Sequence, residues 1–199
     1  MISAASDLEL LSQWSAGSRD AAAALFDRHF AMVHRFFRNK VGAESADLVQ
    51  QTFLACIEAR ERYRAHASFK TYLLAIARHQ LFAFYRERKR FALDVTVTSL
   101  RDLGTSPSGH LARHEHEWLL AEALTRIPLE SQVILELVYW EDLTGTELAC
   151  VLEVPINTAT SKLRRARLAL AAALQKSTPV RGAADALIER VRTLEAAPA

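Results

Sequence analysis

Helix-breaking residues are scarce in this chain of 199 residues, which contains only six glycines and five prolines. No alternating run of Val and Ile predicts a strand, whereas Ala, Leu, Arg and Glu are abundant. Half of the residues are apolar, which is enough for a packed core. We therefore expect an all-α fold and no extensive disorder.

Cysteines and long apolar runs are scarce as well. The two cysteines, Cys56 and Cys150, both lie in helical patterns with apolar neighbours. We expect buried, reduced thiols, as in a reducing cytosol, with a redox pair as the alternative. The N-terminus has no basic region followed by an apolar run, and no stretch approaches the roughly 18 apolar residues of a membrane span. The sequence therefore predicts a cytoplasmic protein that does not insert into membranes.

Motifs of catalytic sites are missing. The chain has no P-loop, nucleophile elbow, C-x-x-C pair or paired-acid motif, so we expect no catalytic residues, no cofactor and no enzyme activity. His110, His114 and His116 cluster at a spacing that can share a metal ion. Because no cysteine lies nearby and HExxH is absent, we interpret the cluster as a solvated helix start, with a metal site as the alternative.

Charge is unevenly distributed, although the net charge is only +2. Residues 69–90 carry six basic residues and one acidic residue, and residues 156–176 carry five basic residues and no acidic one. Between them, residues 91–155 carry three basic and eleven acidic residues. Two separate basic patches indicate two contacts with one polyanion.

The first basic segment, Ser68–Arg90, predicts a long helix. Ser68 precedes the helical pattern, where its hydroxyl can accept from an unpaired amide of the first turn. The inward stripe is Phe69, Tyr72, Leu73, Ile76, Ala77, Leu81 and Phe84. The opposite face carries Arg78, His79, Phe82 and Arg86. Cations interleaved with rings are typical of surfaces that bind single-stranded nucleic acid, whereas a solvated charged helix end is the alternative.

Three helices are predicted before this segment. Ser6–Ser15 places Leu8, Leu11 and Trp14 on one side, and Ser18 caps a helix that runs to about Lys40 and ends at Val41-Gly42. His29 falls in the apolar stripe of this second helix, where we expect a hydrogen-bonded, half-buried histidine. The third helix, about residues 44–60, turns Val49, Phe53, Cys56 and Ile57 inward and exposes Asp47, Gln50 and Gln51 together.

A second domain follows a linker of polar and small residues. One helix spans about 114–126 and ends at Ile127-Pro128, and another starts near Leu129. Residues 143–158 then predict a short helix, a tight turn and a new helix capped near Asn157. The small Ala149 allows a close crossing, and Leu148, Leu152 and Val154 fill the angle between the helices. This pattern is typical of a helix-turn-helix.

The second helix of this pair predicts a DNA-reading surface. Ala159, Leu163, Ala166 and Leu170 face inward, whereas the outward positions are Thr158, Thr160, Ser161, Lys162, Arg164, Arg165 and Arg167. Hydroxyls and guanidinium groups on one face suit a major groove. The tail holds a weak amphipathic pattern that fits either a disordered end or a docking element.

Three motifs together resemble those of bacterial RNA polymerase sigma factors of the sigma-70 family, extracytoplasmic-function (ECF) type. Residues 47–53, D-L-V-Q-Q-T-F, resemble the family's D-L-V-Q-E-T-F. Residues 68–78 resemble S-F-R-A-W-L-Y-R-I-A-R, and residues 154–167 resemble V-P followed by T-V-K-S-R-L-x-R-A-R. The resemblance implies two small helical domains: sigma region 2 at 1–90, a flexible linker at 91–113, the region 4 helix-turn-helix at 114–175, and a tail at 176–199.

The resemblance also implies a role for each surface. Core RNA polymerase would bind through its β′ clamp helices and β flap, the former at Asp47, Gln50 and Gln51. The single-stranded −10 element would contact Arg64, His66, Ser68, Phe69, Tyr72, Arg78, His79, Phe82 and Arg86. The duplex −35 element would contact Asn157, Thr158, Thr160, Ser161, Lys162, Arg164, Arg165 and Arg167. An anti-sigma factor is a further candidate partner, and neither ATP nor a metal is implied.

Some positions depart from the family pattern. Gln51 replaces an acid, Tyr72 a Trp, His79 an Asn, Thr160 a Lys, and Glu153 replaces a Gly that would tolerate positive φ in the turn. These changes leave the promoter sequence open. The alternative function is a helix-turn-helix regulator that is not a polymerase subunit, but it leaves Asp47 and the Ser68–Arg90 helix without a role.

Overall fold

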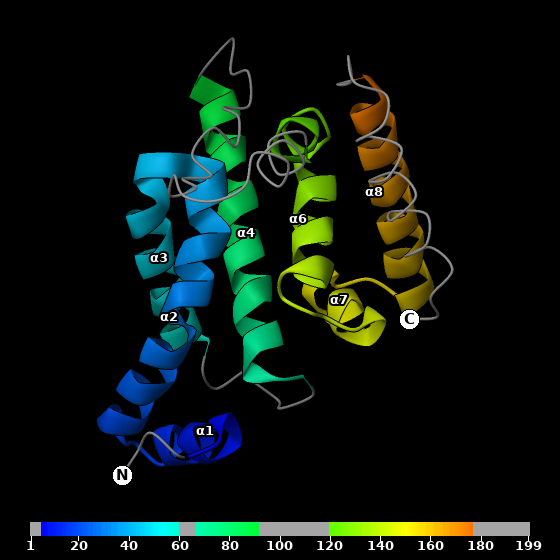
Figure 1. The fold of residues 1–199 in the computed structure, drawn as a ribbon. Helices are drawn as coiled ribbons and strands as arrows, with labels where there is room; N and C mark the ends of the chain where they lie inside the picture. The colour runs from blue at the N-terminus through cyan, green and yellow to red at the C-terminus, as the bar shows by residue number, and fades with distance from the viewer. Residues whose placement is uncertain (1–4, 60–66, 92–119, 177–199) are drawn as a thin grey trace, which may run out of the picture. The chain divides into compact units, whose positions relative to one another are not determined.

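The computed structural model describes residues 5–59, 67–91 and 120–176, and these residues are helical with no strand among them (Figure 1). The chain divides into two compact units, Met1–Thr98 and Ser99–Ala199. The expected all-α fold with two helical domains is confirmed. Within the described part of the chain, no helix is long and apolar enough to span a membrane.

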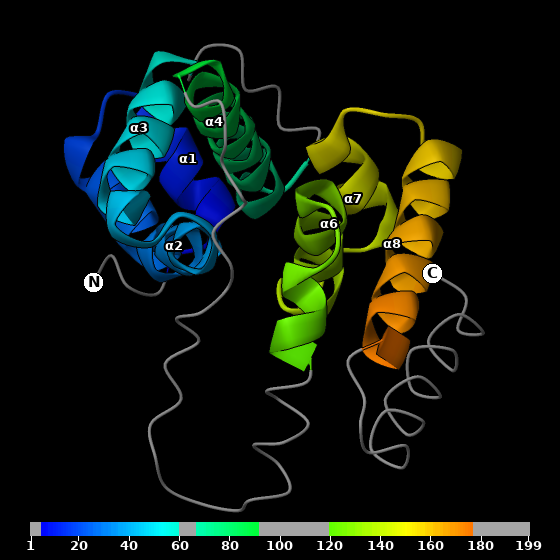
Figure 2. The ribbon, with the colours of Figure 1, turned by 90° about the horizontal axis from the view of Figure 1, so that it is seen from above.

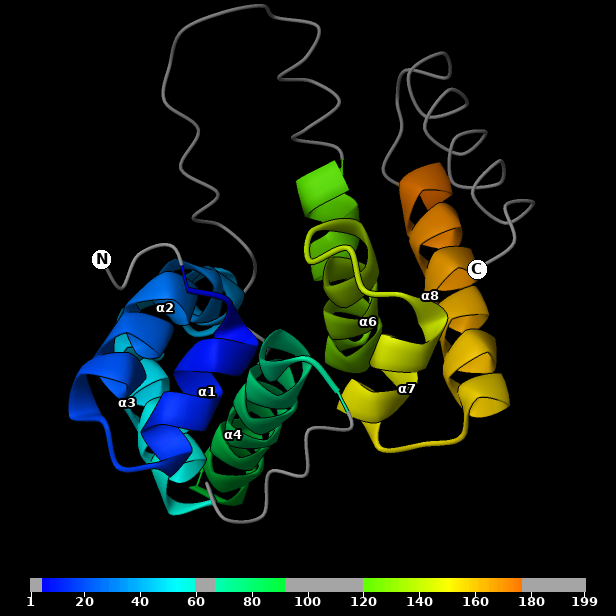
Figure 3. The ribbon, with the colours of Figure 1, turned by 90° about the horizontal axis from the view of Figure 1, so that it is seen from below.

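The first unit is built from α1 (Asp7–Ser15), α2 (Arg19–Val41), a short 3₁₀ turn η2 (Gly42–Glu44), α3 (Ser45–Glu58) and α4 (Phe69–Phe91). Helices α2, α3 and α4 run side by side, and α1 lies across their end (Figures 1 and 3). Their shared core contains Phe36 and Phe37 of α2 and Leu73, Leu74 and Leu81 of α4, all fully buried.

Local sequence explains where these helices begin and end. Ser6 and Glu9 form a capping box at the start of α1, and the Ser18 hydroxyl accepts from the Ala21 amide at 3.2 Å to cap α2. Helix α2 ends at Gly42, whose φ of 61° is accessible to glycine at little cost. The predicted cap at Ser18 and the predicted end at Gly42 are confirmed.

Several predicted core positions are wrong in detail. Leu8 is exposed, and Leu10 is buried in its place beside Leu11 and Trp14. Ile57 is 47% exposed, whereas Leu48 and Thr52 fill the inner face of α3. The Thr52 hydroxyl donates to the Leu48 carbonyl at 2.7 Å, so this polar side chain is buried without an unmet hydrogen bond.

The two cysteines differ. Cys56 is buried, and burial raises the pKa of its thiol to about 12, so the thiol stays protonated. Cys150 lies on an exposed position of its helix, so the expectation of two buried thiols is wrong for Cys150. Both are unpaired.

The second unit contains a helical segment at residues 120–125, then α6 (Leu129–Tyr139), α7 (Gly145–Leu152) and α8 (Ile156–Lys176). In Figures 1 and 2, α7 connects α6 to α8 and lies at an angle to both. The core of the second unit is aliphatic, with Val133, Leu137, Leu148, Val151 and Ala159 almost fully buried. The predicted inward positions of α8, from Ala159 to Leu170, are confirmed.

Some expectations concern residues outside the described ranges. They are the linker at 91–113 (apart from Phe91), the tail at 177–199, the start of the helix predicted at 114–126, and the cluster of His110, His114 and His116. Among the described residues, no group of three His, Cys, Asp or Glu side chains could hold a metal ion.

Candidate nucleic-acid and polymerase interfaces

The outer face of α3 presents the polar cluster that the sequence predicts. Asp47, Gln50 and Gln51 are all exposed, and their spacing of three or four residues places them on one face. None of the three makes a hydrogen bond or ion pair within residues 5–59, 67–91 and 120–176. The cluster is therefore available to a partner.

This polar cluster continues into an apolar surface that sequence reasoning missed. Leu54 is 50% exposed and Ile57 47% exposed on α3, and Phe30 is 51% exposed on α2. The Phe30 and Phe53 rings lie nearly parallel with centroids 6.4 Å apart, so the apolar surface extends from α3 onto α2. The periodicity i, i+3, i+4 from Asp47 through Gln50 and Gln51 to Leu54 could have revealed it.

Helix α4 begins at the predicted cap. The Ser68 hydroxyl accepts from the Thr71 amide at 3.1 Å and shares a 2.7 Å hydrogen bond with the Thr71 hydroxyl. Tyr72 is half-buried, and its hydroxyl donates to the Ala59 carbonyl at 3.4 Å, which ties α4 to the end of α3. Ser68 itself is exposed, so the cap lies at the surface of the unit.

Phe69 does not belong to the surface. Its side chain is 1% exposed, and its ring makes an edge contact with the His29 ring at 5.3 Å between centroids. Direct contact with DNA, which the resemblance implied for Phe69, is inconsistent with this burial. The side chain holds the first turn of α4 from within, as its place in the inward stripe indicates.

The middle of α4 mixes charge and rings as predicted. The Arg78 guanidinium carbon lies 5.2 Å from the Phe82 ring centroid, and both residues are partly exposed. The Arg78 Nε is buried and has no hydrogen-bond partner among the described residues. His79 and Arg86 are exposed. Arg64 and His66 lie outside the described residues.

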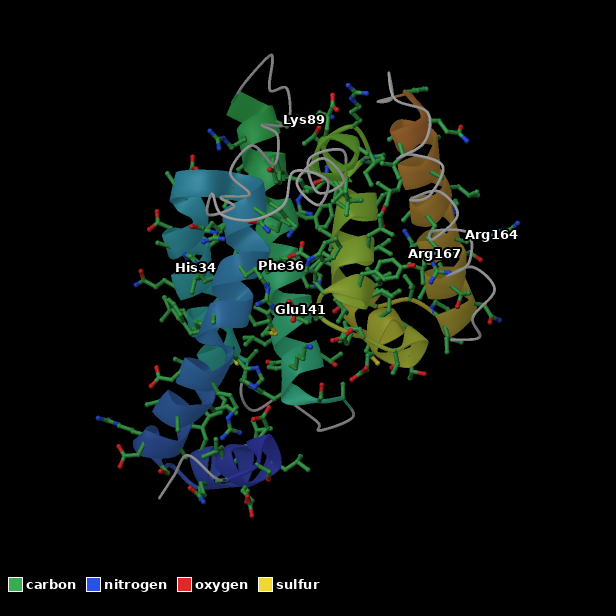
Figure 4. The ribbon with its side chains drawn as sticks, viewed as in Figure 1. His34, Phe36, Lys89, Glu141, Arg164 and Arg167 are labelled. Atoms are coloured by element: carbon green, nitrogen blue, oxygen red, sulfur yellow. The ribbon has the colours of Figure 1, made fainter. Side chains whose placement is uncertain are left out.

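The last turns of α4 are anchored to the end of α2 and to η2. Tyr85 donates its hydroxyl to the Lys40 carbonyl at 2.6 Å, and burial raises the pKa of Tyr85, so it stays a donor. Arg88 pairs with Glu44 at 3.1 Å and covers the Phe84 ring. Lys89, at the end of α4, is exposed (Figure 4). The basic end of this helix is thus held in a fixed position.

The turn between α7 and α8 has the geometry of a helix-turn-helix. Thr144 and Glu147 form a capping box at the start of α7. The chain leaves α7 through Glu153 in the left-handed region (φ 56°, ψ 43°), and Val154 donates to the Ala149 carbonyl at 3.1 Å. The family pattern has a Gly at this position, which predicted a positive φ, and Glu153 adopts it.

Helix α8 starts one residue earlier than its predicted cap. Pro155 precedes the first turn and its carbonyl accepts from the Thr158 amide at 2.8 Å, so Asn157 lies inside the helix rather than at its cap. Asn157, Thr160, Ser161, Arg164 and Arg165 are exposed, and Thr158 is half-buried. In Figure 4 the Arg164 side chain points away from α6.

Two of the predicted DNA-binding cations instead contact α6. Lys162 donates to Glu130 at 2.6 Å, and Arg167 donates through Nε to the Tyr139 hydroxyl at 2.7 Å while covering its ring. The remaining arginines, Arg164 and Arg165, stay outward; Arg165 bonds only to the Ser161 carbonyl of its own helix, at 3.3 Å. The outward residues therefore form a surface of hydroxyl, amide and guanidinium groups.

A helix-turn-helix with a basic outer face defines the second unit as a DNA-binding domain of known type. Two family models match the chain: "Sigma-70 region 2" at residues 25–91 and "Sigma-70, region 4" at residues 117–170. The first covers most of the four-helix unit and the second covers the helix-turn-helix.

Curated relatives agree. The RNA polymerase sigma factor YlaC of Bacillus subtilis is 26% identical over 80% of this chain and 95% of its own length. The ECF RNA polymerase sigma factor SigC of Mycobacterium tuberculosis is 33% identical over 63% of this chain and 68% of its own length. The chain therefore belongs to the sigma-70 family, ECF type. It is a sigma factor, the subunit that binds core RNA polymerase and directs promoter recognition, as predicted.

Solved structures share the fold. CnrH, solved in complex with the cytosolic domain of CnrY, superimposes with a TM-score of 0.63 over 86% of this chain and 99% of that chain, at 22% identity. RpoE of Bartonella quintana, solved with the anti-sigma factor NepR, gives 0.59 over 75% of this chain and 94% of that chain, at 19% identity. At these identities the likeness concerns the fold alone.

Proposed function

We propose that the two units divide the work of promoter recognition. The first unit, residues 1–90, would bind core polymerase and the melted −10 element, and residues 114–175 would bind the duplex −35 element. Residues 91–113 would be a flexible connection between them. The proposal is supported by two chemically different surfaces, one per unit, each carrying residues of the family motifs.

The polymerase surface is the outer face of α3, with Asp47, Gln50 and Gln51 at one end and Leu54 and Ile57 at the other. Exposed apolar side chains beside hydrogen-bonding groups are typical of a protein interface, where apolar groups supply affinity and polar groups fix the register. The proposed partner is the pair of clamp helices of the β′ subunit. An amide at Gln51 in place of an acid lowers the negative charge offered to them.

The proposed −10 surface lies on α4 and combines Ser68, Tyr72, Arg78, His79, Phe82 and Arg86. The resemblance adds Arg64 and His66, which lie outside the described residues. Flipping a base out of a duplex costs a few kcal/mol, which stacking on rings and contacts to phosphates offset. Arg78 supports this role because its Nε has no hydrogen-bond partner within the part of the chain that the structure describes, and a phosphate or base oxygen would satisfy it. Phe69 would contribute only by supporting the helix.

The −35 surface is the outer face of α8. Ser161, Arg164 and Arg165 are placed to reach base edges in a major groove, together with Asn157 and Thr160 at the start of the helix. Thr158, Lys162 and Arg167 lie closer to the core and would be nearer to the phosphates. The β flap of the polymerase is the proposed second contact of this unit.

An anti-sigma factor is a proposed regulatory partner, because RpoE was solved with the anti-sigma factor NepR, and CnrH was solved with the cytosolic domain of CnrY. The chain would act in the cytoplasm, where polymerase and promoter are present. It would carry out no chemistry itself and need no cofactor, since the polymerase supplies the catalysis.

The observation that carries this proposal is the exposed cluster at Asp47, which makes no hydrogen bond or ion pair among the described residues and lies on the same unit as the α4 surface. The test is transcription in vitro with sigma-free core polymerase and genomic promoter fragments. We expect discrete new transcripts that disappear with Asp47→Ala. Asp27→Ala, which removes an exposed carboxylate from α2, is the matched control and should transcribe normally.

The outcome that contradicts the proposal is equally clear. If folded protein binds duplex DNA but neither transcribes nor co-migrates with core polymerase, the division of work is wrong. Loss of transcription in both Asp variants would instead point to a general effect of charge.

A further inference from the structure

One ion pair links α8, the proposed −35 helix, to α6. Lys162 of α8 donates to the carboxylate of Glu130, in the first turn of α6, at 2.6 Å. The Lys162 side chain is 27% exposed and that of Glu130 45% exposed, so both groups lie at the edge of the unit and remain accessible from solvent. A partly solvated pair of this kind contributes little to folding stability.

The position of Lys162 on α8 places it beside a bound duplex. Successive residues of an α-helix are rotated by about 100°, so Lys162 and Arg167 leave α8 on opposite flanks of its buried stripe. The exposed residues between these flanks include Ser161, Arg164 and Arg165. When such a helix enters a major groove, the outermost side chains face base edges and the flanks face the phosphates on either side.

The two flanks differ in electrostatic character. Arg167 contacts the hydroxyl and ring of Tyr139, which are neutral, and no carboxylate among the described residues compensates the guanidinium charge. Lys162 contacts a carboxylate, which compensates its charge and would itself repel an approaching phosphate. The flank at Arg167 can therefore attract a phosphate, whereas the carboxylate beside Lys162 repels a phosphate that approaches the other flank.

We propose that Glu130 is an affinity-limiting residue of the −35 surface: it holds Lys162 in an ion pair and so withholds one phosphate contact from the bound duplex. This inference rests on the proposed −35 role of α8. Phosphate contacts strengthen binding to every sequence alike. Because Glu130 withholds one phosphate contact, the affinity for DNA depends more on base contacts and on the polymerase. The free subunit is then retained less on DNA of random sequence.

The test is Glu130→Gln in the full chain, measured by fluorescence anisotropy with a labelled random-sequence duplex across a salt series. Removing the carboxylate frees Lys162, so the slope of log affinity against log salt should steepen by about 0.9, and the affinity should rise about eightfold near 0.1 M salt. A promoter fragment recovered from the transcription assay should gain by the same factor, because a phosphate contact carries no sequence information.

The matched control is Glu122→Gln. It removes the same charge and also breaks one ion pair, that of Glu122 with Arg126 within one helical segment of the same unit. We expect its salt slope to equal that of the wild type. In the double variant Glu130→Gln, Lys162→Gln the steepening should disappear, which separates release of Lys162 from a general change in charge.

Three outcomes overturn the inference. An unchanged slope in Glu130→Gln means that Lys162 does not reach a phosphate when released. Weaker binding by a folded variant means that Glu130 positions Lys162 for DNA rather than withholding it. If neither the wild type nor any variant binds duplex DNA at low salt, the −35 role of α8 fails as well, whereas wild-type binding with an unchanged slope rejects only the role of Glu130.

Discussion

Asp7 and His29 join α1 to the centre of the first unit: the Asp7 carboxylate lies 2.7 Å from the His29 Nε2, and its other oxygen lies 2.6 Å from Arg28. The His29 ring in turn contacts Phe69, the first residue of α4. A single carboxylate on an N-terminal helix therefore supports the start of the proposed −10 helix through one intervening ring. The contact between Asp7 and His29 confirms the expectation that His29 is hydrogen-bonded.

The first prediction concerns acid stability. Partial burial raises the pKa of Asp7, but hydrogen bonds and charges from Arg28 and His29 outweigh it, so the pKa is lowered overall from 3.8. A carboxyl whose pKa falls on folding stabilises the fold above its unfolded pKa, and this contribution is lost as the pH falls through the folded value. Asp7→Asn should cost about 0.5–1 kcal/mol at pH 7.

Urea unfolding at neutral pH and below about pH 4 measures this effect. The difference between Asp7→Asn and the wild type should shrink as Asp7 of the wild type becomes protonated. The control is Asp20→Asn, a change of the same kind in the first turn of α2. A difference between wild type and Asp7→Asn that is constant with pH would contradict the prediction.

The second prediction concerns the turn of the helix-turn-helix. Glu153 adopts positive φ, which costs a residue with a Cβ about 1 kcal/mol relative to glycine. Glu153→Gly and Glu153→Ala remove the same side-chain contacts, but only glycine relieves the backbone. We expect the glycine variant to be more stable than the alanine variant by about 1 kcal/mol in thermal unfolding. Equal stability would mean that the turn relaxes its φ in the alanine variant.

The sequence predicted the parts of the fold that depend on local chemistry. Caps at Ser18 and Ser68 and the helix end at Gly42 each follow from one residue and its immediate neighbours, whereas the positive φ at Glu153 was implied by the resemblance to the family pattern. It was harder to predict which side of a short helix is buried. In α1 the choice between Leu8 and Leu10 depends on where α2 lies, which periodicity over nine residues does not decide.

The candidate surfaces show a similar limit. Exposure of Asp47 and Arg164 could be predicted because charged side chains rarely lie in a core. Ile57 was misplaced because an apolar side chain fits either a core or an interface, and only packing distinguishes the two. Phe69 is buried, as the inward stripe predicts, and this burial does not fit the DNA contact that the resemblance implied. The ion pair of Lys162 with Glu130 joins residues 32 positions apart, so no local pattern indicates it.

The third prediction tests the ring on α4. Phe82→Ala should weaken binding of the polymerase complex to single-stranded −10 DNA by about 5- to 150-fold, the range expected when one stacked base loses its aromatic partner. Phe82 is only half-buried and pairs with Arg78, so the loss of stability should be modest. Phe69→Leu serves as the comparison, since a buried ring should change unfolding more than DNA binding. Unchanged DNA binding by Phe82→Ala would show that this ring is not part of the −10 surface.

The last prediction tests the apolar half of the polymerase surface. Leu54 is 50% exposed, so Leu54→Asp should change the free energy of unfolding by less than about 0.5 kcal/mol. A charge buried against a partner without a counter-ion is costly, so the same variant should lose co-migration with core polymerase on size exclusion. Leu8→Asp is a matched control, because Leu8 is 70% exposed on α1 of the same unit and belongs to neither proposed surface. Retained polymerase binding by Leu54→Asp would confine the interface to Asp47, Gln50 and Gln51, whereas its loss would show that this interface extends along α3 into the apolar surface.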